Sequence, residues 1–382
     1  MRALAITLLL AACSGPAPLA DAGEAAPTAD GEVLRVDAGV DAGPRPTTGL
    51  YRPPPPAAPV GSRRCRRGFD AFHFGELSLA SAGGVRLGPG AVLAREPVFA
   101  AEWPSAAADS GLIYPERPEE PTLPLLRGPI GAAPFGSAFL FVGPRAGEAV
   151  MAEPLSRSSR LRVALDAPDV DVAVSARDGG ALLAWGALIY QPLDARLAPA
   201  GAPRRVDVGV ALESVHLVRT DLGIVALGAA ACGPVVHALD ATGAPLDDPY
   251  CLDVAGAPTS DPWWDGARVV WTFDEGILEL DGHGSLAAWT PAPGMVPMAA
   301  FGGDDAVVVL RDADRANPRP GVVELERGTG ALRGGLGFAR GETTAATIAS
   351  ASVAVGEGRA WFAYRPEGSG RVGSVLVDCA AD

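Results

Sequence analysis

Short apolar runs recur along the chain, each placed directly after a glycine or an aspartate. They are AVLA after Gly90, SAFLFV after Gly136, ALLAW after Gly180, IVAL after Gly223, ARVVW after Gly266, AVVVL after Asp305 and RAWFAY after Gly358. Short apolar runs bounded by turn residues favour strands over helices. The intervals between the runs are 46, 44, 43, 43, 39 and 53 residues, so one small unit repeats along the chain.

A second strand-like segment follows most of the later runs, and it ends in an acidic residue before a glycine turn. These segments are Ile189–Asp194, Val235–Gly243, Ile277–Gly284 and Val322–Gly330, with Ser374–Asp378 as the last copy. Tight hairpin turns need residues that tolerate positive φ, which explains the glycines and aspartates. Each unit therefore contains a hairpin.

Two strands joined by a turn, repeated at a period near 43 residues, are typical of the four-stranded blade of a β-propeller. Because each blade buries its faces only against its neighbours, the ring must close. The sequence predicts an all-β propeller over residues 65–382, with seven blades as the best count and six to eight compatible with the spacing. A pair of β-sandwiches is the alternative, since their strands also alternate with turns.

The segment from Gly266 to Trp289 and the run VVHALDATGAPL from Val235 resemble the repeat of PQQ-like (WD40-like) β-propellers. In that family one glycine opens a strand, a second glycine turns it, and Leu-Asp…Gly closes the unit before an aromatic residue. Quinoprotein dehydrogenases of this type carry adjacent cysteines and an acid/Asn set around calcium. This chain has no such cysteine pair and a single asparagine, Asn317. The resemblance therefore implies the scaffold, and no cofactor is expected.

The first residues indicate export. Arg2 precedes the apolar stretch 3–10, which is too short for the roughly 20 residues of a membrane span. Leu10-Ala11-Ala12-Cys13 resembles the lipobox of bacterial lipoproteins. This resemblance implies a signal peptide at 1–12, palmitate-type lipidation of Cys13 and anchoring in the cell envelope. Ser14 favours the outer membrane, on its periplasmic side or at the cell surface. The alternative is an ordinary cleaved signal peptide.

Residues 13–64 differ in composition from the repeats. Asp-Ala-Gly recurs at Asp21, Asp37 and Asp41, and Pro53–Pro56 favours polyproline II. With so few large apolar side chains, this stretch is predicted to be a disordered tether.

Cysteine usage suggests two disulfides. Lipidation of Cys13 leaves four cysteines, and an even number in an oxidising compartment is typical of paired thiols. Of the three pairings, we favour Cys232 with Cys251, which bracket one hairpin, and Cys65 with Cys379, which stand at the two ends of the repeats.

Charge and motifs exclude several functions. A net charge of −14 argues against nucleic acid as a partner. The four histidines lack metal-ligand spacing, and no nucleophile-elbow motif occurs, so no catalytic residue and no metal are predicted. Trp263 and Trp264, followed by Asp265, are the candidate binding residues, expected in a connecting loop, because paired tryptophans stack on sugars or anchor proteins.

These features favour a monomeric, non-catalytic binding or scaffold propeller that is held on a membrane and takes an envelope protein or a glycan. The alternative is a hydrolase or lyase that acts on polysaccharide with acids near the ring axis, the candidates being Asp304, Asp305 and Glu279. Two carboxylates about 5–9 Å apart across a pocket would support that alternative.

Overall fold

The fold is known from a computed structural model. It describes residues 66–67, 86–93, 96–103, 109–114, 131–143, 148–152, 161–164, 172–303, 305–312, 320–338, 347–356, 358–368 and 372–379. Cys13, Cys65 and Asp304 lie outside these residues, as do the predicted signal peptide and tether.

The described residues form seven antiparallel sheets and no helix. Blade one contains β2 (Arg86–Leu93), β3 (Glu96–Trp103) and β4 (Asp109–Ile113). Blade two contains β5 (Gly131–Phe135), β6 (Ala138–Gly143), β7 (Glu148–Ala152) and β8 (Leu161–Ala164). Blade three contains β9 (Val172–Arg177), β10 (Gly180–Trp185), β11 (Ile189–Leu193) and β12 (Arg204–Arg205).

The remaining four blades are each four-stranded. Blade four contains β13 (Leu212–Arg219), β14 (Ile224–Ala230), β15 (Gly233–Leu239) and β16 (Tyr250–Cys251). Blade five contains β17 (Trp263–Trp264), β18 (Val269–Phe273), β19 (Gly276–Leu280) and β20 (Leu286–Pro291). Blade six contains β21 (Pro297–Gly302), β22 (Ala306–Arg311), β23 (Gly321–Glu326) and β24 (Leu332–Phe338). Blade seven contains β25 (Ile348–Gly356), β26 (Arg359–Pro366), β27 (Gly373–Asp378) and β1 (Arg66–Arg67).

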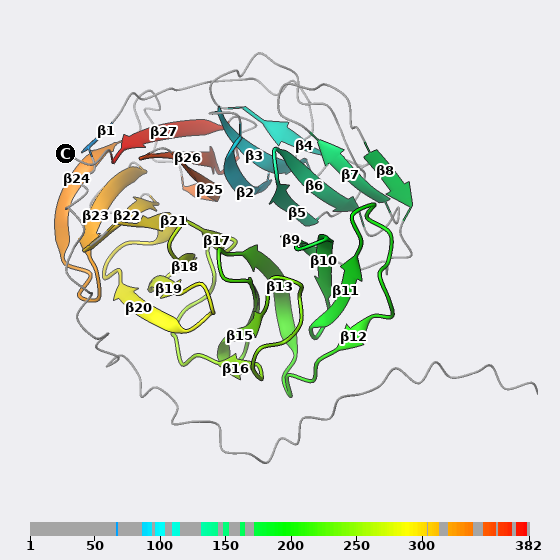
Figure 1. The fold of residues 1–382 in the computed structure, drawn as a ribbon. Coiled ribbons are helices and arrows are strands. Elements are labelled where there is room, and N and C mark those ends of the chain that lie inside the picture. The colour runs from blue at the N-terminus through cyan, green and yellow to red at the C-terminus, as the bar shows by residue number, and fades with distance from the viewer. Residues whose placement is uncertain are drawn as a thin grey trace, which may run out of the picture.

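The seven sheets are arranged as a ring, which Figure 1 shows along its axis. In blades one to six the strand that comes first along the chain lies toward the middle and the last strand lies on the rim, whereas in blade seven β25 is innermost and the early strand β1 is outermost (Figure 1). The ring closes in blade seven, where the early strand β1 pairs with the last strand β27 and Arg66 is opposite Asp378. The predicted seven-bladed all-β propeller is therefore confirmed.

The sequence repeats mark particular strands. Six of the seven glycine or aspartate positions stand at the start of the second strand of a blade, as Gly180 does for β10. The acidic-ended segments are the third strands β11, β15, β19, β23 and β27. Gly90 is the exception, because it lies inside β2, the first strand of its blade. The apolar run after Gly90 therefore belongs to a strand, as expected, but to the first strand of its blade and not the second.

The acidic residue that ends several third strands holds the next turn. One carboxylate oxygen of Asp281 accepts backbone N–H bonds from His283 at 2.9 Å and from Ser285 at 2.8 Å. Asp194 and Asp240 accept the equivalent pairs of backbone bonds in blades three and four. Such turns suit aspartate because its short side chain reaches the backbone a few residues on. The aspartate of the repeated Leu-Asp sequence therefore stabilises the turn that follows it.

Gly276 shows why a second glycine is needed in blade five. A Cβ atom at this position would lie 2.6 Å from the Trp289 ring and from the Thr290 carbonyl oxygen. Only glycine allows β20 and its tryptophan to approach β19 this closely. The glycine and the tryptophan of the segment 266–289 are therefore packing partners.

The hydrophobic core is divided among the interfaces between blades. Seven clusters of buried residues occur in the described chain, and each contains residues from two neighbouring blades. Trp271 of β18, for example, packs with Val218 of β13 and Leu227 of β14. Since every blade is covered on both faces only by its neighbours, the ring folds as one unit.

Cysteines reinforce the ring. Cys232 and Cys251 form a disulfide that links the turn before β15 to β16, as predicted. Cys379 is buried and also disulfide-bonded. Its predicted partner Cys65 lies outside the described residues, although the next residue, Arg66, pairs with Asp378. In the described part of the chain, no helix is long and apolar enough to cross a membrane.

Candidate functional site

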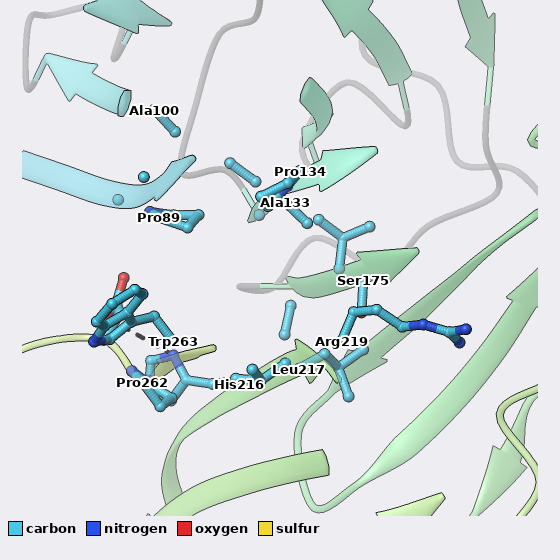
Figure 2. Close-up of a pocket in the computed structure, with 18 of the residues that line it drawn as sticks. Pro89, Ala100, Ala133, Pro134, Ser175, His216, Leu217, Arg219, Pro262 and Trp263 are labelled. Carbon is cyan, nitrogen blue, oxygen red and sulfur yellow. Dashed lines mark ion pairs between the residues drawn. The ribbon is translucent and has the colours of Figure 1, made fainter. Parts of the chain in front are cut away.

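A cavity of about 900 Å³ opens where the first strands of several blades meet. Figure 2 shows its labelled residues, which come from five blades and surround a common space. Small and apolar residues such as Pro89, Ala133 and Leu217 make up much of the wall. A closed ring of strands holds such a wall rigidly, so the cavity is preformed.

Strand β13 contributes four polar residues to the cavity wall, and two of them, Ser214 and His216, lie within reach of each other. Its register with β14 shifts between Leu212 and Ser214, so that Glu213 is an extra residue in a β-bulge. Side chains alternate along a strand, so Ser214 and His216 share one face. The His216 Nε2 atom lies 3.2 Å from the Ser214 hydroxyl oxygen. Bulges re-aim side chains in this way and are common beside functional sites.

An aspartate from the next blade completes the cluster. Asp261, just before β17, has a carboxylate oxygen 3.7 Å from His216 Nδ1. The Arg86 guanidinium of β2 lies 3.4 Å from the same oxygen. We call Arg86, Ser214, His216 and Asp261 the axial polar cluster. All four line the cavity, with Ser214 and Asp261 on opposite ring nitrogens of the histidine.

The cluster favours a neutral imidazole. Burial lowers the pKa of His216, Asp261 raises it, and Arg86 lowers it again. Only 19% of the His216 side chain is exposed, against 31% for Asp261 and 66% for Arg86. The ring also packs edge-on against Trp271, with centroids 5.6 Å apart. At neutral pH the histidine is therefore a fixed base that can accept a proton.

The predicted binding tryptophans do reach the cavity, but not from a loop. Trp263 and Trp264 form the inner strand β17 of blade five and both line the cavity (Figure 2 shows Trp263). The loop prediction was wrong because the pair makes ladder contacts with Val269 and Val270 of β18. The Trp263 indole N–H donates to the Ala300 carbonyl at 2.8 Å, which fixes the ring between blades.

Asp265 is a structural residue. Its carboxylate accepts backbone N–H bonds from Ala267, Arg268 and Gly302, at 2.8, 2.7 and 2.9 Å. It is absent from the cavity wall. Burial raises its pKa, and the three backbone donors act in the opposite direction. Asp265 therefore joins blades five and six.

The acids expected near the axis lie elsewhere. Glu279 is completely buried on the third strand of blade five, where Arg327 binds it through Nε at 2.8 Å and Nη2 at 2.9 Å. Asp305 is exposed on blade six and pairs with Arg333 at 2.7 Å. Neither lines the cavity, so neither occupies the position that the polysaccharide-cleaving alternative requires. The described residues include no group of three or more His, Cys, Asp or Glu that could hold a metal.

The sequence pattern did not predict the axial polar cluster. Ser214 and His216 are close in sequence, but their acidic partner comes from another blade, and Arg86 and Asp261 are 175 residues apart. The useful signal would have been a serine and a histidine two positions apart in an otherwise apolar strand (Ser-Val-His).

Comparisons with known proteins support the fold alone. No family model and no curated protein matches this chain. Among solved structures, the β-propeller domain of Cps50 (Swd1) from Myceliophteria thermophila matches with a TM-score of 0.50 and 11% identity, over 78% of this chain and 98% of that one. The Pan2 WD40 domain of Neurospora crassa matches with a TM-score of 0.50 and 10% identity, over 78% of this chain and 90% of that one. The chain therefore has a WD40-like seven-bladed propeller fold.

Proposed function

We propose that this protein is a lipid-anchored binding propeller of the bacterial cell envelope, which takes a protein or glycan partner at the mouth of its axial cavity. The observation that carries the binding role is the preformed cavity of about 900 Å³, with two tryptophans and a charged cluster on its wall. Tryptophan supplies a large contact area at little conformational cost, which suits either kind of partner.

The anchoring part of the proposal is supported by the Leu10-Ala11-Ala12-Cys13 sequence and the polar, proline-rich stretch that follows it. Acyl chains on Cys13 would hold the chain on a membrane, and the tether would let the ring reach a partner. The PQQ-like assignment of the blades is part of the same proposal, supported by the glycine and tryptophan spacing of residues 266–289.

A photocrosslinking experiment tests the binding site. A benzophenone amino acid replaces Glu213, an exposed residue of the cavity wall, in the full-length protein expressed in its host. The matched control replaces Glu275, which is equally classed as exposed but lies in the β18–β19 turn away from the cavity. We expect an adduct at position 213 and none at 275. Equal labelling at both positions, or none at 213, would contradict the proposal.

The same adducts distinguish the two kinds of partner, because periodate cleaves the partner portion of a glycan adduct and leaves a protein adduct at its original mass. The anchor is tested separately by feeding cells an alkyne-labelled palmitate. We expect label on the wild-type chain and none on Cys13→Ala, and label that persists on the variant would refute lipidation at Cys13.

A further inference from the structure

The axial polar cluster contains the three groups of a nucleophilic relay in the correct order. The Ser214 hydroxyl faces Nε2 of His216, and the Asp261 carboxylate faces Nδ1. A serine is a weak nucleophile unless an adjacent base accepts its proton, and a carboxylate on the other nitrogen orients that base and stabilises its cation. This arrangement is recognised by geometry and not by sequence order.

The surroundings are those that a relay requires. The histidine is largely withdrawn from solvent and packed against Trp271, so its orientation is fixed. Its neutral form is favoured by burial, so it is ready to act as a base. The 3.7 Å separation between His216 and Asp261 is longer than a hydrogen bond, and such contacts commonly tighten only when a substrate binds.

We propose that Ser214 and His216 are catalytic residues for the hydrolysis of carboxylic esters with small acyl groups, with Asp261 as a positioning residue. The class of substrate follows from the cavity, whose wall is built mainly from glycine, alanine, valine and proline. A small apolar acyl group matches such a wall, and a cavity of about 900 Å³ admits a compact alcohol portion as well.

The reaction balances with water as the only co-reactant. The Ser214 oxygen bonds to the ester carbonyl carbon while its proton passes to His216 Nε2. The carbon–oxygen bond to the alcohol then breaks, and the leaving alcohol takes that proton. Water next attacks the acyl-serine, gives a proton to Nε2 and releases the acid, after which the proton returns to the serine.

The inference shares the cavity with the proposed binding function but requires no partner, so the two can fail separately. The full-length protein is treated with a fluorophosphonate, a probe that reacts with activated serines, and the adduct is located by mass spectrometry. Hydrolysis of p-nitrophenyl acetate and butyrate is measured in parallel. Ser285→Ala is the control, because Ser285 is exposed in the β19–β20 turn and does not line the cavity.

We expect one adduct on Ser214 in the wild type and in Ser285→Ala, and none in Ser214→Ala. Turnover should fall at least about 100-fold in Ser214→Ala and in His216→Gln, the scale that base-assisted catalysis supplies. Asp261→Asn should reduce turnover less and shift the pH midpoint, with partial recovery in Asp261→Glu. Absence of an adduct, an adduct on another serine, or unchanged turnover in Ser214→Ala would overturn the inference.

The photocrosslink at position 213 is repeated in the Ser214→Ala background. Its persistence with turnover abolished supports the hydrolytic role of Ser214 and shows that binding is separate. If the protein hydrolyses esters but gives no crosslink at position 213 in either the wild type or Ser214→Ala, the hydrolytic inference stands and the binding proposal is refuted.

Discussion

Two acidic residues of blade five differ sharply in their surroundings. Glu279, on the third strand, has no exposed surface and receives two short bonds from Arg327, with Arg268 3.6 Å away. Asp261, before the first strand, is about one-third exposed, and its side-chain ion pairs with described residues are long, at 3.4 Å to Arg86 and 3.7 Å to His216. The first carboxylate is saturated by fixed partners, whereas the second is held loosely beside a cavity.

Burial alone therefore does not identify a functional acid. A buried carboxylate with short, complete hydrogen bonds contributes to the folded structure, because removing it leaves charged partners in a dry place. A half-buried carboxylate with incomplete contacts keeps the capacity to respond to a proton or a ligand. The candidate site of this propeller is therefore the axial polar cluster. Glu279, with Arg327 and Arg268, is a structural link between blades.

The largest loss of stability is expected from a substitution of Glu279. Glu279→Gln should lower the free energy of unfolding by about 3–5 kcal/mol, since Arg327 and Arg268 then lose the carboxylate charge inside the protein. Asp261→Asn should lower it by less than about 1 kcal/mol, the scale of exposed ion pairs. Chemical denaturation of the two variants measures both values. Equal losses would show that the two acids have the same role.

A smaller loss of stability is expected from substitutions of two histidines, one of which lies in the core and the other at the cavity wall. His237 is 1% exposed, and its Nδ1 atom lies 2.9 Å from the Tyr190 hydroxyl in the core. His237→Leu leaves that hydroxyl buried without its partner and should cost about 1–3 kcal/mol of stability. His216→Leu, at the cavity wall, should cost less. Adding Tyr190→Phe to His237→Leu should restore part of the loss, and a double variant that is less stable still would contradict this assignment.

The subtlest prediction concerns pH. Because Arg86 lowers the pKa of His216 and Asp261 raises it, Arg86→Gln should move the imidazole titration to higher pH and Asp261→Asn should move it to lower pH. Nuclear magnetic resonance titration of His216 follows this directly, without any assumption about activity. Arg333→Gln, on the surface of blade six beside Asp305, is the control and should leave the titration unchanged. Shifts of the same sign in both cluster variants would rule out the described electrostatics.

Much of the fold was readable from the sequence because each blade signals itself locally. The hairpin that begins at Gly266, the aspartate that holds the turn after Leu280 and the glycine that admits Trp289 are all encoded within one repeat. Turn residues and short apolar runs act over a few residues, so they can be recognised in a single sequence. The run after Gly90 departs from the other six because it lies in the first strand of blade one.

The repeating β-units could be read from the sequence, which favoured seven blades and the Cys232–Cys251 pairing, because these features depend on contacts between near neighbours in the chain. Only the tertiary structure decided which polar residues meet at the axis. Closing the ring brings Arg86, His216 and Asp261 together from three blades, and it buries Glu279 against an arginine of blade six. Such meetings depend on the curvature of the whole ring, which no single repeat contains.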